Sequence, residues 1–161
     1  MTDSLGALLA LNGEESLLRS KLMADYGVKW LTTPLVMDKW LTLHATCGSD
    51  TCLEVLEKLT EHAAFSFSNP NRVRSLVGAF TANLVQFHRY DGKGYDFLTE
   101  TIIKLNTLNP QVAARLITPL IQFKKFDFHR QSLIKSALER ILALPDLSTD
   151  LYEKVSKALD Y

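Results

Sequence analysis

Apolar residues recur along the chain at helical spacing, three or four positions apart, and no segment shows the strict alternation typical of a half-buried strand. Two segments, which begin at Asn69-Pro70 and at Asn109-Pro110, show this spacing most clearly. The pattern predicts an all-α protein. The predicted stripes are Val73, Leu76, Val77 and Phe80 in the first segment, and Val112, Leu116, Leu120 and Phe123 in the second.

Both Asn-Pro pairs are typical of a helix start, because the Asn side chain can accept from exposed backbone N–H groups and proline suits the first helical position. They lie 109 − 69 = 40 residues apart, and each predicted helix carries an arginine in its second turn, Arg74 and Arg115. A repeat of about 40 residues that holds two helices predicts a right-handed α-solenoid of the HEAT or armadillo kind.

Caps and breakers along the rest of the chain predict about nine helices joined by short turns. In the second helix we expect Leu17, Leu18, Leu22 and Met23 to face inward and Gly27 to end the helix, with Trp30 in the connector that follows. Pro119 should kink or end the helix that contains it. The predicted helices cover residues 2–11, 14–26, 34–48, 51–62, 70–82, 95–105, 110–123, 127–144 and 149–159.

Length and charge narrow the class of protein. The chain has 161 residues, which is enough for one domain with a real core, so we expect a single helical-repeat domain over residues 1–161. Lys plus Arg equal Asp plus Glu at 18 each, which disfavours nucleic acid and anionic membranes as partners. No apolar run approaches a membrane span, and the N-terminus does not resemble a signal peptide. We therefore expect a cytoplasmic protein.

Two local patterns could carry chemistry, and both have a simpler interpretation. His44, Cys47 and Cys52 have partial zinc-ligand spacing, but a fourth ligand is missing nearby, so ordinary buried thiols are favoured. Gly92-Lys93-Gly94 lacks the long glycine loop that cradles phosphate, so a plain turn is favoured there.

Several longer runs resemble the bacterial aminopeptidase N, or alanyl aminopeptidase, family. They are PLVMDKW at 34–40, FSNPNRVRSL at 67–76, GY at 94–95, NPQVA at 109–113 and DLYEKVSKAL at 150–159. The resemblance covers essentially the whole chain. It implies that the chain corresponds to roughly the last half of the family's C-terminal helical domain.

The family resemblance implies zinc chemistry in a parent enzyme, held by His-Glu-x-x-His and a more distant Glu, with a Gly-x-Met-Glu-Asn loop for the substrate amine. The four histidines here are followed by Ala, Ala, Arg and Arg, and the three methionines by Thr, Ala and Asp, so neither motif is present. We expect no catalytic residue and no metal in this chain, with zinc elsewhere in the parent, and no peptidase activity from these 161 residues alone.

The resemblance further implies a helical domain that closes over the zinc domain and lines a substrate chamber, with residues matching Arg74, Gln111 and Arg115 facing peptide. Arginine can hold a peptide carboxylate or carbonyl by charge-assisted hydrogen bonds. Spacing alone favours the simpler interpretation, in which these residues are rim positions beside an apolar stripe. Arg72 better fits a solvated face. The aromatic residues Trp30, Trp40, Phe65, Phe67 and Tyr95 fit packing rather than substrate contact.

Two functional hypotheses follow. The first is the C-terminal piece of an aminopeptidase, with the N-terminal and catalytic domains of the parent and peptide substrates as partners. The alternative is a free-standing α-solenoid that binds a protein or peptide. The N-terminal segment favours the first hypothesis, because its stripe of Leu5, Leu8, Leu9 and Leu11 has almost no charge beside it, unlike the polar cap of a complete solenoid. An exposed apolar edge there would promote self-association.

Overall fold

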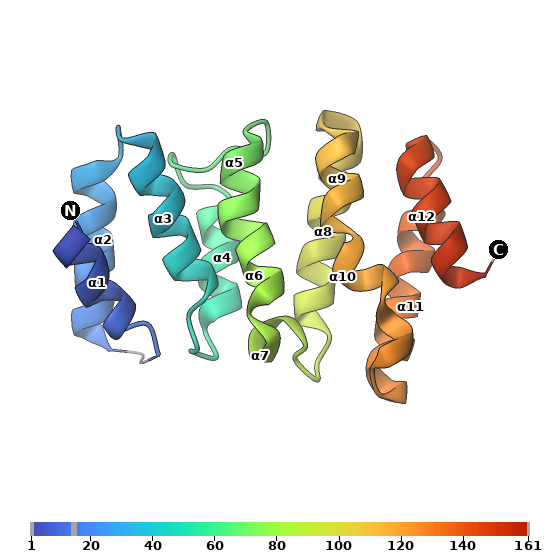
Figure 1. The fold of residues 1–161 in the computed structure, drawn as a ribbon, viewed down its shortest axis with the longest axis horizontal. Coiled ribbons are helices and arrows are strands. Elements are labelled where there is room, and N and C mark those ends of the chain that lie inside the picture. The colour runs from blue at the N-terminus through green and yellow to red at the C-terminus, as the bar shows by residue number, and fades with distance from the viewer. Residues whose placement is uncertain (1, 14–15, 161) are drawn as a thin grey trace. The chain divides into compact units, whose positions relative to one another are not determined.

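The computed structural model describes residues 2–13 and 16–160. These residues form helices and connecting turns without strands, so the predicted all-α fold is confirmed. The chain divides into two compact units, unit 1 up to Gln86 and unit 2 from Phe87 onward, which are described separately (Figure 1). The expectation of one helical-repeat domain over residues 1–161 stays a prediction.

Unit 1 contains α1 (Thr2–Ala10), α2 (Leu17–Trp30), α3 (Pro34–Ala45), α4 (Cys52–Leu59), α5 (Pro70–Val73), the π-helical segment η1 (Arg74–Gly78) and α6 (Ala79–Ala82). The boundary between the units falls within α7 (Leu84–Phe87). Unit 2 contains α8 (Lys93–Leu108), α9 (Pro110–Leu116), α10 (Thr118–Ile121), the 3₁₀ turn η2 (Phe123–Lys125), α11 (Phe128–Leu142) and α12 (Thr149–Leu159).

Because α5, η1 and α6 run on without a break, the described residues form eleven α-helical elements rather than about nine. The two extra elements are short. One is the single turn α7. The other is α10, which exists because α9 ends at Leu116 and the helix restarts at Thr118, as the break predicted from Pro119 requires.

Both Asn-Pro helix starts are confirmed. The Asn69 Oδ1 accepts from the backbone N–H of Asn71 at 3.0 Å and of Arg72 at 3.4 Å. The Asn109 Oδ1 accepts from the Val112 N–H at 3.2 Å. In each case proline occupies the first helical turn, where its missing N–H leaves no bond unmade.

Each unit has its own core. In unit 1, α3 packs against α2, α4 and the run α5–η1–α6, and α4 lies behind α3 and α5 in the view of Figure 1. In unit 2, α8 packs against α9 and α11, while α12 packs against α9 and α11. The predicted stripe after Asn69 is fully buried, whereas in the second stripe Val112 is half-buried and the other three residues are buried.

The prediction for α2 was wrong in two respects. The start predicted at Glu14 lies outside the described residues, but the helix runs past Gly27 to Trp30. Of the predicted inward stripe only Met23 is buried, while Leu17 is 91% exposed. Leu18 and Leu22 are exposed as well, because the buried face of α2 consists instead of Arg19, Met23, Tyr26 and Gly27.

Gly27 is buried because α2 approaches α3 closely there. A Cβ atom at Gly27 would lie 2.7 Å from the Cζ2 atom of the Trp40 ring, closer than side-chain carbon atoms come to one another. The glycine therefore serves close helix packing, and the C-terminal stop that the sequence predicted at this position is wrong.

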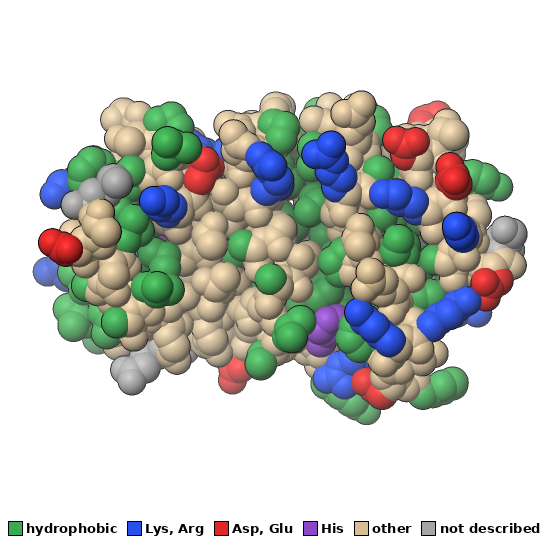
Figure 2. Space-filling view, viewed as in Figure 1, with side chains coloured by type: hydrophobic (Ala, Val, Ile, Leu, Met, Phe, Trp, Pro, Cys, Tyr) green, Lys and Arg blue, Asp and Glu red, His purple; other side chains and the backbone are tan. Residues whose placement is uncertain are grey.

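The predicted apolar edge is present at the N-terminal end of unit 1, although its composition differs from the prediction. Leu8 of α1 is buried, Leu5 and Leu11 are half-buried, and Leu9 is 62% exposed. Most of the exposed apolar surface lies on α2 and at the start of α3, and Figure 2 shows apolar side chains gathered over this end of unit 1. Its members on those helices are Leu17, Leu18, Leu22, Val28 and Leu35.

No helix within the described part of the chain is both long and apolar enough to cross a membrane.

Candidate functional site

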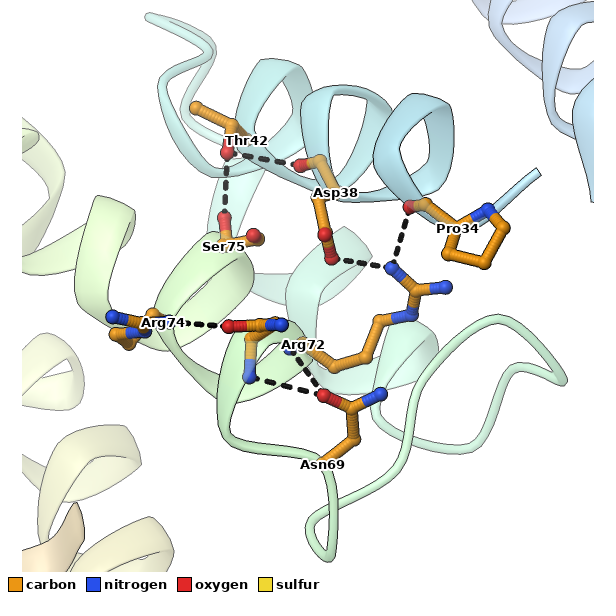
Figure 3. A network of polar contacts seen from close by, with 8 residues as sticks. Pro34, Asp38, Thr42, Asn69, Arg72, Arg74 and Ser75 are labelled. Atoms are coloured by element: carbon orange, nitrogen blue, oxygen red, sulfur yellow. Dashed lines mark hydrogen bonds and ion pairs between the residues drawn. The ribbon is translucent and has the colours of Figure 1, made fainter.

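Arg74 lies at the first position of η1, one turn after the Asn69 cap. Its side chain is exposed, and its guanidinium donates to the Oδ1 of Asn71 on the preceding turn (Figure 3). Asn71 is itself held, because its backbone N–H donates to Asn69. The helix start therefore fixes both the position and the direction of the Arg74 head group.

The π-helical turn that begins at Arg74 was not predicted from the sequence. The Ala79 N–H donates to the Arg74 carbonyl, five residues back instead of four. A π segment is rare and is frequent at functional sites. The Thr42 Oγ1 of α3 lies 3.1 Å from the Ser75 carbonyl and 3.0 Å from the Asp38 carbonyl, and it shares its single proton between them (Figure 3). The irregular turn is thus tied to α3.

Arg72 contradicts the expectation of a solvated face. Its side chain is only 11% exposed and forms an ion pair with Asp38 of α3, which is 20% exposed. The same Arg72 Nη1 donates to the Pro34 carbonyl at 2.8 Å (Figure 3). The side chain lies along α3 because both of its partners are on that helix, so Arg72 joins α5 to α3 instead of pointing into water.

Gln111 and Arg115 lie one turn apart on α9 in unit 2, and both side chains are exposed. The opposite side of α9 is buried through Ala113, Ala114 and Leu116. Neither the Gln111 amide nor the Arg115 guanidinium has a hydrogen-bond or ion-pair partner among the described side chains. These two residues therefore present unengaged donors on one face, while Arg74 belongs to the other unit.

A basic groove of about 470 Å³ lies beside the C-terminal end of α9, between α10 and α12. It is lined by Lys124, Lys154 and Lys157, with Glu153 as its acidic member. Figure 2 shows lysine and arginine side chains spread over this face of unit 2. The groove could not be predicted from the sequence, because its lysines come from segments about 30 residues apart and none belongs to a recognisable motif.

Two carbonyl groups near the end of α9 accept from side chains. Proline has no N–H for the Arg115 carbonyl, and the Thr118 Oγ1 donates to that carbonyl at 3.0 Å instead. The Lys154 Nζ donates to the neighbouring carbonyl, that of Ala114. A lysine is favoured there because carbonyl groups at a helix C-terminus carry partial negative charge.

Potential metal ligands do not converge in the described residues, where no group of three or more His, Cys, Asp or Glu side chains is placed to hold a metal ion. Cys47 and Cys52 are buried thiols, as the simpler interpretation predicted. The Cys52 Sγ donates to the His44 carbonyl at 3.4 Å, which places the sulfur against main chain.

The histidines of unit 2 have structural partners. The His88 Nδ1 lies 2.7 Å from the buried Tyr95 hydroxyl, and burial, followed by the charges of Arg130 and Lys125, lowers the pKa of His88. The His129 Nε2 lies 2.8 Å from the Tyr90 carbonyl. These contacts hold the segment before α8 against α11 and show no arrangement of nucleophile and base.

Each unit is built of helices packed side by side, as in armadillo-type helical repeats. The chain belongs to the family described as a domain of unknown function (DUF3458_C) with ARM repeats, whose model matches residues 1–160. The predicted solenoid class is therefore confirmed.

The chain is also similar in sequence and structure to bacterial aminopeptidases. The chain is 52% identical over 160 residues to aminopeptidase N of Haemophilus influenzae and 49% identical to aminopeptidase N of Escherichia coli, covering 99% of this chain and 18% of each relative. A crystal structure of Legionella pneumophila aminopeptidase A in complex with aspartic acid matches with a TM-score of 0.92 and 31% identity, covering 99% of this chain and 19% of that one. The resemblance to bacterial aminopeptidase N is confirmed, and the chain spans less than a fifth of these relatives.

Proposed function

We propose that this chain is the C-terminal helical part of a zinc-dependent aminopeptidase that removes N-terminal amino acids from peptides. In this role it closes and lines the substrate chamber and carries no catalytic centre of its own. The observation that carries the proposal is the similarity to aminopeptidase N along 99% of the chain at 52% and 49% identity. The zinc belongs to another part of the parent enzyme, because His-Glu-x-x-His is missing from this sequence.

Peptide contact is assigned to Arg74, Gln111 and Arg115. All three side chains are exposed: Gln111 lies in the first turn of α9, Arg115 in its last turn, and Arg74 one turn after the Asn69 cap. A guanidinium can donate two parallel hydrogen bonds to a carboxylate or bridge to a peptide carbonyl, and the Gln111 amide can both donate and accept. The Arg74 guanidinium donates a hydrogen bond to Asn71, which orients it. Arg115 has no such partner among the described side chains, so a substrate could bind it without displacing one.

The neighbouring lysines support an anionic end of the bound peptide. Lys154 and Lys157 add positive charge on α12, next to the helix that carries Arg115. Several cations on one face raise the local concentration of an anionic ligand. A peptide whose free carboxylate points toward α9 and α12 fits this charge distribution.

The partners in this proposal are the N-terminal and catalytic domains of the parent and its peptide substrates, in the cytoplasm. The exposed leucines of α1 and α2 are the surface on which preceding helices of the parent would pack. When this chain is produced alone, the same surface would promote self-association.

Reconstitution tests the proposal. The purified 161-residue chain is assayed on an alanine-linked chromogenic substrate with added zinc, alone and mixed with the separately expressed remainder of a parent aminopeptidase. We expect no aminopeptidase activity from the chain by itself and measurable activity from the mixture. Activity from the chain by itself would contradict the missing catalytic centre. Failure to restore activity on mixing would favour a free-standing solenoid that binds a protein or peptide.

The residue assignment is tested in the full-length enzyme with Arg115→Ala. Loss of a charge-assisted hydrogen bond made at an exposed site should lower kcat/KM about tenfold, which corresponds to about 1.4 kcal/mol. Arg140→Ala is the matched control, because Arg140 is an exposed arginine of the same unit whose partners are Asp96 and Glu100. It should leave kcat/KM unchanged. An equal loss of thermal stability and activity in Arg115→Ala would overturn the assignment.

A further inference from the structure

A cavity of about 400 Å³ lies within unit 1, between α2, α3 and α4. Its volume falls in the range typical of small-molecule sites, about 300–1,000 Å³. The walls are mainly apolar, and their core-facing members are Met23, Trp40, Val55 and Leu59. The cavity lies outside the peptide-contacting residues proposed above.

Two buried nitrogen atoms on this wall have no hydrogen-bond partner among the described residues. Arg19 is 8% exposed, and although its Nη2 donates to the Asn12 Oδ1 at 2.6 Å, its Nε is buried and unengaged. The Nε2 of His44 is also buried and unengaged. Buried polar atoms are nearly always hydrogen-bonded in folded proteins, so two such atoms on one cavity wall point to a missing acceptor.

The charge state of the pair defines what that acceptor can be. Burial, followed by the charges of Arg19 and His62, lowers the pKa of His44 to about 3, so its imidazole is neutral at pH 7 and can present Nε2–H as a donor. Arg19 keeps its positive charge. The residues that line the cavity include no Asp or Glu, so no carboxylate of the cavity wall neutralises the charge of Arg19.

Trp40 supplies a fixed apolar surface beside these donors. Its indole Nε1 donates to the Met23 carbonyl at 2.8 Å, and the His44 ring meets it edge-on with centroids 4.6 Å apart. Gly27 lies against the same ring. A rigid aromatic wall next to a buried cation suits a ligand that combines an apolar body with a negative group.

We propose that this cavity binds a small organic carboxylate with an apolar, ring-sized body. The carboxylate accepts from Arg19 Nε–H and His44 Nε2–H, and the ring lies against Trp40. Charge-assisted hydrogen bonds to a buried guanidinium give the site its preference for anions, and the apolar walls give its preference for a ring over a bare ion. The proposal does not depend on the aminopeptidase assignment.

Phenylacetate is the probe, and binding to the 161-residue chain is followed by the ¹⁵N resonances of the His44 ring and the Trp40 indole. Saturable shifts with a dissociation constant of about 1 mM are expected for a ligand of this size. Phenylacetamide, which keeps the shape without the charge, and acetate, which lacks the ring, should each bind about tenfold more weakly. Equal binding of phenylacetamide, or no saturable shift, would overturn the proposal.

Two variants separate loss of the site from loss of folding. Ala24 is exposed and lines the cavity, so Ala24→Trp should fill it and abolish the shifts while the chain keeps its melting temperature. Leu18→Trp adds the same ring at an exposed position of α2 that does not line the cavity, and it should bind like the unchanged chain. Arg19→Gln should weaken binding about tenfold. Binding that survives in Ala24→Trp would refute the location.

Discussion

Replacing Gly27 by alanine sets two opposing effects against each other. Alanine is favoured over glycine in a helix interior by about 1 kcal/mol, so the substitution should stabilise α2 if space were available. The new Cβ, however, would lie 2.7 Å from Cζ2 and 2.9 Å from Cε2 of Trp40. Overpacking of a core costs about 1–3 kcal/mol.

The surroundings of Trp40 place this cost at the upper end of the range. The ring is 4% exposed and flanked by His44 and His62, and a rotation away from Gly27 would break its hydrogen bond to the Met23 carbonyl. A penalty of about 3 kcal/mol less a gain of about 1 kcal/mol gives a net loss of about 2 kcal/mol in the free energy of unfolding. The expected result is a lower urea midpoint with an unchanged slope.

Gly6→Ala is the matched control, because Gly6 is also helical, in α1, and a Cβ there would meet nothing within 4 Å. This variant should gain up to about 1 kcal/mol. Combining Gly27→Ala with Trp40→Leu should restore part of the loss, with a coupling energy of about 1–2 kcal/mol. If Gly27→Ala stabilised the chain as much as Gly6→Ala, the close approach of α2 and α3 would be refuted.

Three further predictions follow from other contacts. The pKa of His44 is lowered from 6.5 to about 3, so the stability that its neutral form contributes is complete above pH 6.5 and is lost as pH falls. At pH 5 the free energy of unfolding should be lower by about 2 kcal/mol. In urea titrations, His44→Gln should lack this part of the pH dependence. Asp38→Ala should lower the free energy of unfolding by about 2 kcal/mol, because it leaves the largely buried Arg72 with only a carbonyl partner. The control is Asp96→Ala, which breaks an exposed ion pair with Arg140. A loss above ~1 kcal/mol in that control would contradict the expected order of the two effects. Leu17→Glu should reduce self-association in sedimentation experiments, and Leu108→Glu, at another exposed leucine, should not.

The helical class and most helix limits could be predicted from local chemistry. The two Asn caps and the break at Pro119 depend on a few neighbouring residues, so the sequence alone was enough to place them. The buried face of α2 could not be predicted, because leucines occupy two faces of that helix and only the packing of α3 decides which one is covered.

The candidate site shows the same division. The sequence placed Gln111 and Arg115 in early turns of a capped helix; both are exposed, but α9 ends at Leu116, so Arg115 lies in its last turn. It did not reveal the partners of Arg72, the π turn at Arg74 or the cavity beside Arg19. These features depend on contacts between residues far apart in sequence, such as the 34 positions that separate Asp38 from Arg72. That Arg74, Gln111 and Arg115 contact peptide stays a prediction.

The lysine that reaches the end of α9 has a consequence for how this surface tolerates sequence change. Lys154 is held by the main-chain carbonyl of Ala114, and every amino acid carries such a carbonyl. Side chains at the exposed positions of α9 can therefore change without removing the acceptor of Lys154. Among relatives that keep a lysine at this position of α12, we expect its contact with the end of α9 to persist even where the side chains around it differ.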